Sequence, residues 1–394
     1  MRPLQNITVV TLEHAIAAPL CTRHLADLGA RVIKIERPDG GDFARGYDKR
    51  MRGLASHFVW VNRSKESLTL DLKQERALTI LKQLVAGADV FVQNLGPGAT
   101  ARLGLDYPTL KETHAKLIVC DISGYGDNGP YTQKRAYDLL IQSEAGFLSI
   151  TGSPDQPAKS GLSIADIAAG MYAYSSILAA LLERSRTGRG SHLAISMLEA
   201  MSEWMSYPLY YSIDGQTPPA RTGAAHASIF PYGPFVCGDG KTVMLGLQNE
   251  REWSTFCTKI LQRPELAADP QYGGNANRLQ HRVALQAIID ETFAALTSSQ
   301  LIERLEQAQI ANAQMNDLKG LWDHPQLKAR NRWVAINTPA GPVPSLLPPH
   351  SVAGESDPPR MDAVPALGEH TGVILKEIGL SDAEIADLRT AQAV

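Results

Sequence analysis

The first half of the chain alternates short, almost purely apolar runs with longer stretches in which apolar residues recur every three or four positions. The short runs are typical of strands buried on both faces, and the longer period is typical of helices packed on a sheet. This alternation predicts a doubly wound α/β domain with a parallel sheet. The expected strands cover residues 7–12, 31–36, 68–72, 90–93, 117–123 and 192–197, and the expected helices cover 18–28, 75–86, 99–103, 107–114, 163–183 and 198–211.

A change of composition marks a second unit. Residues 214–223 are rich in Pro, Gly and polar residues, and the pattern after them predicts a strand at 242–247 and helices at 251–261, 278–296 and 299–309. Residues 339–365 are again rich in Pro and Gly, and such a long irregular stretch usually crosses a surface or a partner chain. We expect a large Rossmann-like domain at 1–212 and 330–394, a linker at 213–225, a small α+β domain at 226–315 and a return linker at 316–329.

One acidic residue, Asp166, stands in an otherwise uncharged, Ala-rich run that extends from Gly161 to Leu182. The apolar period predicts a helix that is buried on most sides. Two interpretations of the acid are open from its spacing. In one, Ser163 is the N-cap and Asp166 is the third helical residue of a capping box. In the other, Asp166 is a nucleophilic carboxylate, kept from water and supported by backbone donors, that attacks an acyl carbonyl.

Composition excludes several other classes of protein. The 394 residues carry a net charge of −3 with acids and bases interspersed, so nucleic acid and anionic membranes are not expected partners. The apolar runs are interrupted by polar residues and the N-terminus lacks the apolar core of a signal peptide, so we expect a cytoplasmic protein. The four cysteines lack the spacing of metal ligands. We expect them to be reduced residues of the core: Cys21, Cys120, Cys237 and Cys257.

Short segments spread over the whole chain carry a resemblance to a known family. They are Val9 to Pro19, Leu28 to Pro38, Asn62 to Lys73, Val90 to Gly98, Gly124 to Pro130, the Asp166 helix with Arg186 to Gly190, and Leu367 to Thr371. In this order and spacing they resemble the class III CoA-transferase family. Its members include formyl-CoA transferase, carnitine CoA-transferase and, as a divergent branch, alpha-methylacyl-CoA racemase.

The resemblance implies both a fold and a reaction. Family members are intertwined homodimers in which each subunit is a ring threaded by the other. The reaction moves CoA from an acyl-CoA donor, here best taken as succinyl-CoA or another short-chain or dicarboxylyl-CoA, to a free carboxylic acid. Asp166 would form an aspartyl-acyl anhydride and then an aspartyl-CoA thioester. CoA is then a substrate, and neither a tightly bound cofactor nor a metal is expected.

The resemblance also implies which residues surround CoA. They are Ile16, Ala17, Arg37, Leu70, Asp71, Leu72, Lys73, Asn94, Leu95, Gly96, Arg102, Arg135, Ala136, Tyr137 and Asp138. The 3′-phosphate and pyrophosphate of CoA favour Arg, Lys and backbone N–H groups as ligands. Arg37 and Lys73 directly follow expected strands, which favours this role over that of surface charges. His14, Arg221 and His226 are candidates for binding the carboxylic acid, although each is also an ordinary loop residue.

Departures from the family pattern bear on specificity and leave alternatives open. Ile16 stands where formyl-CoA transferase has glutamine, and the glycine run that covers its site is missing, so formate and oxalate are not the expected acids.

A racemase needs a second acid or base across the α-carbon, and racemases of this family carry a histidine where this chain has Tyr137. A non-catalytic CoA-binding protein would lack the acid at 166. A dehydrogenase would carry a glycine fingerprint after the first strand, which this chain lacks.

Overall fold

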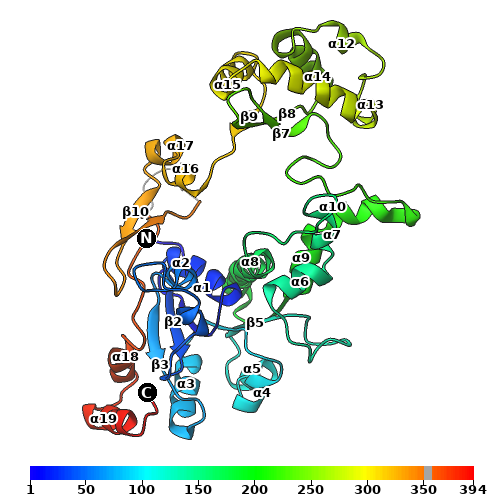
Figure 1. Cartoon of the computed structure of the whole chain (residues 1–394). Helices are drawn as coiled ribbons and strands as arrows, with labels where there is room; N and C mark the ends of the chain where they lie inside the picture. Colours follow the sequence, from blue (N-terminus) through cyan, green and yellow to red (C-terminus); the bar gives the residue numbers. More distant parts are fainter. Residues whose placement is uncertain (350–356) are drawn as a thin grey trace. The chain divides into compact units, whose positions relative to one another are not determined.

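The structure is a computed structural model that describes residues 1–349 and 357–394 (Figure 1). The chain forms two compact units. The first unit contains residues 1–145, 160–206 and 327–394, and the second contains residues 146–159 and 207–326. Part of the irregular stretch expected at 339–365, residues 350–356, lies outside the described residues.

A parallel, six-stranded sheet forms the centre of the first unit. Its order is β3-β2-β1-β4-β5-β6, which reverses direction between β1 and β4 as in doubly wound nucleotide-binding folds. The strands predicted for this half are present with ends shifted by a few residues, so the Rossmann-like α/β architecture is confirmed. The bounds are β1 Thr8–Leu12, β2 Arg31–Glu36, β3 Glu66–Thr69, β4 Val90–Gln93, β5 Ile118–Ser123 and β6 His192–Ser196.

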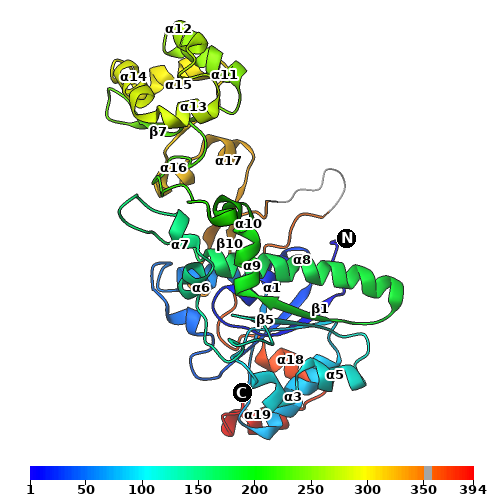
Figure 2. The same cartoon turned by 90° about the vertical axis from the view of Figure 1, so that its right-hand side faces the viewer.

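Helices cover both faces of this sheet (Figure 2). On one face lie α1 Ala17–Asp27 and α8 Ile164–Thr187, and on the other lie α3 Glu75–Ala86, α5 Tyr107–Thr113, α18 Thr371–Glu377 and α19 Asp382–Thr390. Apolar side chains of the second group, such as Leu81 and Ile374, form one core with Val10 and Ile33 of the sheet. Shorter helices complete the unit: α2 Ser56–Val61, α4 Ala99–Leu103, α6 Asp138–Glu144 and α9 Met197–Trp204.

Helices α8 and α1 approach each other at backbone distance. A Cβ atom at Gly170 would lie 2.6 Å from the carbonyl oxygen of Ala17, so this contact requires glycine. Asp166 lies one turn before Gly170 on the same helix face. The contact therefore brings Asp166 toward the N-terminal end of α1 and the loop that follows β1.

Helix α8 also passes a simple test for a membrane span. Among the described helices it has the length and apolar composition needed to cross a bilayer, a test that core helices of soluble proteins pass too. It ends four residues later than the helix predicted to stop at Glu183, with Gly188 as its left-handed C-cap. The absence of membrane partners stays a prediction.

The second unit contains a small antiparallel sheet in the order β7-β8-β9, with helices beside it. The strand predicted at 242–247 is present, but the helix predicted at 278–296 is wrong as one element. It breaks at His281, whose φ of −100° and ψ of 24° leave the helical region although the apolar period continues. The bounds are β7 Tyr232–Val236, β8 Thr242–Gly246, β9 Asn312–Gln314, α11 Glu250–Thr255, a π turn at Phe256–Ile260, α12 Glu265–Ala268, α13 Asn275–Gln280, α14 Arg282–Ala294 and α15 Ser298–Gln307.

Two further expectations are corrected by the structure. The stretch expected to be irregular includes a strand, which pairs with a neighbour in a two-stranded antiparallel sheet. Pro344 lies in this strand, where the sheet has no inner strand and a proline is tolerated. The helix expected to reach Tyr211 ends earlier and is followed by shorter turns. The bounds are β10 Trp333–Ile336, β11 Val343–Leu346, α7 Phe147–Ile150, α10 Ser206–Leu209, a 3₁₀ segment at Tyr210–Gly215, α16 Leu318–Trp322 and α17 Pro325–Ala329.

Candidate active site

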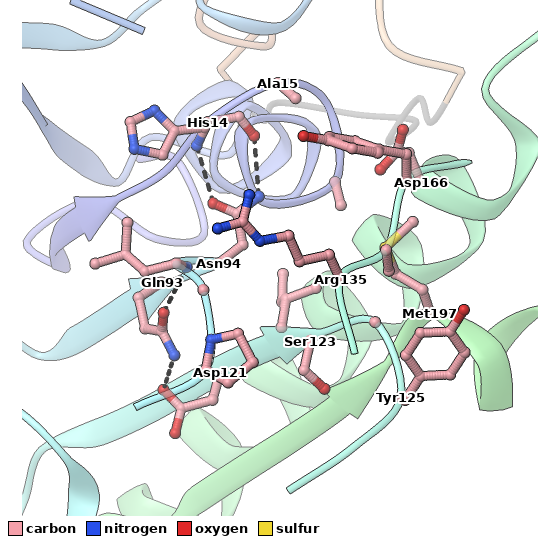
Figure 3. Close-up of a pocket in the computed structure, with 18 of the residues that line it drawn as sticks. His14, Ala15, Gln93, Asn94, Asp121, Ser123, Tyr125, Arg135, Asp166 and Met197 are labelled. Atoms are coloured by element: carbon pink, nitrogen blue, oxygen red, sulfur yellow. Dashed lines mark hydrogen bonds between the residues drawn. The ribbon is translucent and has the colours of Figure 1, made fainter. Parts of the chain in front are cut away.

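A cavity of about 1130 Å³ opens at the carboxyl ends of β1, β4 and β5 in the first unit. The strand order reverses there, and doubly wound sheets bind their ligands at this point. Asp166, Asn94 and Arg135 lie around the cavity (Figure 3). Its walls come from the segments that follow the three strands, at 14–17, 93–98 and 121–127, together with residues 132–139 and the start of α8.

The loop after β1 is held from two sides. The backbone N–H of His14 donates to Asn94 Oδ1 and Asn94 Nδ2 donates to the carbonyl of His14, both at 2.9 Å (Figure 3). Ala15 has a φ of 61° and donates its N–H to Asp42 Oδ1 at 3.1 Å. A non-glycine residue persists in this conformation where its surroundings hold it. These bonds place Ile16 and Ala17, at the N-terminal end of α1, in the cavity wall.

A buried group of charges lies behind this loop. Glu13 accepts hydrogen bonds from Lys65 Nζ at 2.6 Å, Lys34 Nζ at 3.4 Å and Thr22 Oγ1 at 2.6 Å. Lys34 also donates to Asp42 Oδ2 at 2.7 Å, on the carboxylate that holds the loop. Burial alone would raise the pKa of Glu13, but the two ammonium groups outweigh it and lower that pKa to about 2. Glu13 is therefore a permanently ionised structural residue.

The amino end of α8 is capped by a residue from another helix. Asp138 Oδ1 accepts from the N–H of Ala165 at 2.9 Å and from the N–H of Asp166 at 3.4 Å. Ser163 is the N-cap but makes no side-chain cap bond. The capping-box interpretation is therefore wrong, because a carboxylate 28 residues upstream takes its place. The N–H groups of Ala165 and Asp166 are thereby already engaged by Asp138.

The surroundings of Asp166 change its acidity. The side chain is partly buried, and burial followed by the negative charge of Asp138 raises its pKa to about 7. Among the described residues no cation contributes to this shift. A carboxylate that is poorly solvated and lacks a counter-charge is suited to act as a nucleophile. Asp166 thus changes between its protonated and ionised forms near neutral pH.

Aromatic side chains line one wall of the same cavity. The rings of His14 and Phe43 stack at 5.3 Å, Phe43 and Tyr47 lie 5.8 Å apart, and Tyr47 meets His57 edge-on at 5.5 Å. Phe43, Tyr47 and Tyr137 are 45%, 48% and 65% exposed. The wall therefore offers uncovered apolar surface to a ligand or a partner chain.

Two arginines supply positive charge to the cavity. Arg102 and Arg135 line it, and neither guanidinium group makes a hydrogen bond or ion pair with the described parts of the chain. Both guanidinium groups are therefore available to an anion. The segment that carries Arg135 packs closely on the end of β5, because a Cβ at Gly124 would lie 2.2 Å from the Cβ of Ala136.

The structure brings many of the predicted site residues together around this cavity. They are His14, Ile16, Ala17, Asn94, Leu95, Gly96, Arg102, Arg135, Ala136, Tyr137, Asp138 and Asp166. Both oxygens of Asp138 are already engaged, because Oδ2 accepts from Gln142 Nε2 at 2.6 Å. Contact of these residues with CoA stays a prediction.

Other predicted residues lie outside the lining of the cavity. Arg37 and residues 70–73 follow β2 and β3 at the same edge of the sheet, and Leu70 is part of the core. Arg221 and His226 belong to the second unit. There Arg221 donates to the carbonyls of Ser153 and Pro154 at 2.9 and 3.0 Å, and His226 stacks on Tyr232 at 5.2 Å.

Sequence reasoning missed several cavity residues. Gln93 and Ser123 end two predicted strands, and the rule that ligands bind at the carboxyl ends of parallel strands would have found them. The aromatic wall of Phe43, Tyr47 and His57 comes from loops and a short helix whose pattern carries no such signal.

The fold and cavity define a doubly wound α/β protein with a cavity at its switch point, and within residues 1–349 and 357–394 the Asp166 carboxylate in that cavity has no ion-pair partner. The chain belongs to CoA-transferase family III, whose sequence profile matches residues 4–371. The resemblance noted in the sequence is therefore confirmed, and the protein is an acyl-CoA:carboxylate CoA-transferase of class III.

Named relatives and solved structures match over nearly the whole chain. Succinyl-CoA:glutarate CoA-transferase of Homo sapiens is 33% identical, over 100% of this chain and 90% of the relative. Succinate–glutarate CoA-transferase of Agrobacterium fabrum is 34% identical, over 95% and 96%. A crystal structure of a CAIB/BAIF family protein from Brucella suis has a TM-score of 0.83 and 33% identity, over 96% of this chain and 99% of that one.

Proposed function

We propose that this CoA-transferase uses Asp166 as its nucleophile and a dicarboxylyl-CoA, with succinyl-CoA as first candidate, as its donor. One observation carries the proposal. Asp166 lines the switch-point cavity with no counter-cation among the residues that the structure describes, and burial together with Asp138 raises its pKa to about 7. The names of the human and Agrobacterium relatives support the choice of succinyl-CoA.

The reaction follows from the chemistry of a carboxylate in a dry site. Asp166 attacks the thioester carbonyl, the C–S bond breaks, and an aspartyl-acyl anhydride and CoA thiolate form. The thiolate then attacks the aspartyl carbonyl, which releases the donor acid and leaves an Asp166–CoA thioester. The acceptor carboxylate attacks this thioester, which releases CoA thiolate and forms a second anhydride between Asp166 and the acceptor. The thiolate then attacks the acceptor carbonyl of this anhydride, which gives the new acyl-CoA and restores the Asp166 carboxylate. Exclusion of water protects both anhydrides from hydrolysis.

CoA would lie along the carboxyl edge of the parallel sheet. The turn at 94–96 and the available guanidinium groups of Arg102 and Arg135 support binding of its phosphates at the cavity. Arg37 directly follows β2, and Lys73 lies in the segment after β3 at the same edge, which supports contact with the far end of CoA. The N-terminal turn of α1, which has no side-chain cap, supports a role for the N–H groups of Ile16 and Ala17 at the developing oxyanion.

The acceptor carboxylic acid would lie against the aromatic wall of the cavity. Apolar rings suit its hydrocarbon part, and His14 is the cavity residue we propose for its distal carboxylate. His14 Nδ1 is buried, makes no hydrogen bond within the described residues and lies 3.9 Å from Asp42 Oδ1, and burial lowers the pKa of this imidazole. Arg221 and His226, which belong to the second unit, stay candidates for binding a carboxylate.

A homodimer is part of the proposal. Helix α8 exposes Met171 and Leu182 although its other face forms the core, and the aromatic wall is uncovered at Tyr137. Such apolar exposure supports burial by a second copy of the chain in the intertwined arrangement expected from the family.

The test combines product analysis with trapping. Succinyl-CoA is incubated with glutarate, mesaconate, malate and oxalate, and the CoA products are identified by mass spectrometry. We expect a new acyl-CoA from at least one dicarboxylate, and an Asp166 hydroxamate when hydroxylamine is added with the donor. Deuteration of the donor at its α-carbon in heavy water without acid exchange would overturn the proposal in favour of a racemase.

A further inference from the structure

Three side chains connect the edge strand β6 to the cavity turn at Asn94–Gly96. His192 Nε2 lies 2.7 Å from Asp121 Oδ2, and Asp121 Oδ1 accepts from Gln93 Nε2 at 2.9 Å. Gln93 Oε1 in turn accepts from the backbone N–H of Leu95 at 2.7 Å. Figure 3 shows the last two bonds beside Asn94. We call His192, Asp121 and Gln93 the strand relay.

Strand register fixes the members of the strand relay. Gln93 of β4 pairs with Asp121 of β5, and Asp121 in turn pairs with Ala194, two residues after His192 on the same face of β6. The imidazole of His192 also stacks on Tyr107 of α5 at 4.9 Å with the ring planes 9° apart. The geometry therefore follows from the sheet and α5 rather than from a mobile loop.

The charge of Asp121 orients the Gln93 amide. An ionised carboxylate only accepts hydrogen bonds, so it draws the NH₂ group of Gln93 toward itself and turns the amide oxygen toward the Leu95 N–H. The hydrogen bond that His192 donates to Asp121 raises the pKa of the imidazole despite burial, and the charges of Asp121 and Asp127 add to the increase. His192 also contacts the ring of Tyr107, and Lys111 lies on that ring with its Nζ 5.9 Å from the ring centre.

We propose that His192 is a positioning residue for CoA, whose imidazolium holds the turn at Asn94–Gly96 in its binding conformation through Asp121 and Gln93. The inference rests on the CoA site proposed above at this turn. Deprotonation removes the positive charge from the His192–Asp121 pair and leaves a neutral donor on the ionised carboxylate, which weakens this hydrogen bond. CoA affinity therefore falls with rising pH for a reason separate from the titration of Asp166.

The test measures the affinity of the full-length protein for dephospho-CoA by calorimetry at several values between about pH 6 and pH 8.5, the range in which histidine titrates. Dephospho-CoA removes the titration of the 3′-phosphate, and an Asp166→Asn background removes that of the nucleophile. We expect the dissociation constant of this parent to rise about three- to tenfold over the range. His192→Gln, which keeps a neutral donor, should bind less tightly at pH 6 and show no such rise.

Two matched variants separate the possible outcomes. His114→Gln changes the histidine that ends α5 and lies outside the strand relay, so the pH dependence of the parent should persist. Arg135→Ala should weaken binding at every pH. If His192→Gln matches its parent in affinity and pH dependence while Arg135→Ala weakens binding, the positioning role is overturned and the CoA site stands. Unchanged affinity in Arg135→Ala overturns both.

Discussion

Glu13 and Asp166 are carboxylates in water-poor parts of the same unit, yet their pKa values move in opposite directions. Lys34 and Lys65 hold Glu13 at a pKa of about 2, whereas Asp166, beside the like charge of Asp138, reaches about 7. Burial raises the pKa in both places, so the neighbouring charges decide the difference. An acid enclosed by cations is a structural element, and an acid without them is available for chemistry.

Removal of the reactive carboxylate should have the largest effect. We expect Asp166→Ala to lower the rate of CoA transfer at least about a thousandfold, because the covalent route is lost. The helix should persist, since alanine is a good helix former. Steady-state assays check the rate, and circular dichroism checks the fold. Near-normal transfer by this variant would refute the assignment of the nucleophile.

Removal of a cation from the structural carboxylate should instead cost stability. Lys65→Met leaves Glu13 buried with less compensation, and we expect the free energy of unfolding to fall by about 3–5 kcal/mol. Denaturant titration measures the change. Lys319→Met is the matched control, because Lys319 and Asp323 form an exposed pair, and it should unfold like the wild type. A similar result for the two variants would contradict the structural role.

The same comparison predicts a stabilising substitution. The pKa of Asp166 is about 7 in the folded protein, against an ordinary value of 3.8. The folded state therefore holds this proton more tightly than the unfolded state, and the free energy of unfolding falls as pH rises from about 4 to about 7. Asp166→Asn removes that loss, and its stability advantage over wild type should grow by about 2–3 kcal/mol between pH 5 and pH 8. Thermal unfolding at the two pH values tests this. An advantage that is independent of pH would show that Asp166 titrates normally.

The smallest expected effect concerns Asp138, the carboxylate that caps α8. Transfer should decline below about pH 7 as Asp166 becomes protonated. Asp138→Asn removes the like charge and keeps an oxygen that can accept from the N–H of Ala165. The pH at which transfer declines on the acidic side should therefore fall by about 0.5–1 unit. The dependence of kcat on pH with saturating substrates measures the shift. A decline at an unchanged pH would assign the raised pKa to burial alone.

Short-range pattern was sufficient to predict the strands of the parallel sheet and the helix around Asp166, because burial on both faces leaves a clear apolar period. Contacts between distant segments were not predictable in this way. The cap that Asp138 gives to α8 spans 28 residues, and nothing in the spacing of Ser163 and Asp166 reveals it. The break at His281 was likewise not predictable from the apolar period, which runs on through it.

The support of the loop after β1 by groups behind it has a consequence for evolution and redesign. Asn94 and Asp42 fix the backbone at His14 and Ala15, so the path of the chain does not depend on which side chain occupies position 16. Ile16 itself is almost fully buried, so only a side chain of similar volume and polarity is expected to replace it without disturbing its packing. The backbone of this loop and the side chain at its end are thus held by separate contacts, and volume-conserving changes at position 16 should leave the path of the loop intact.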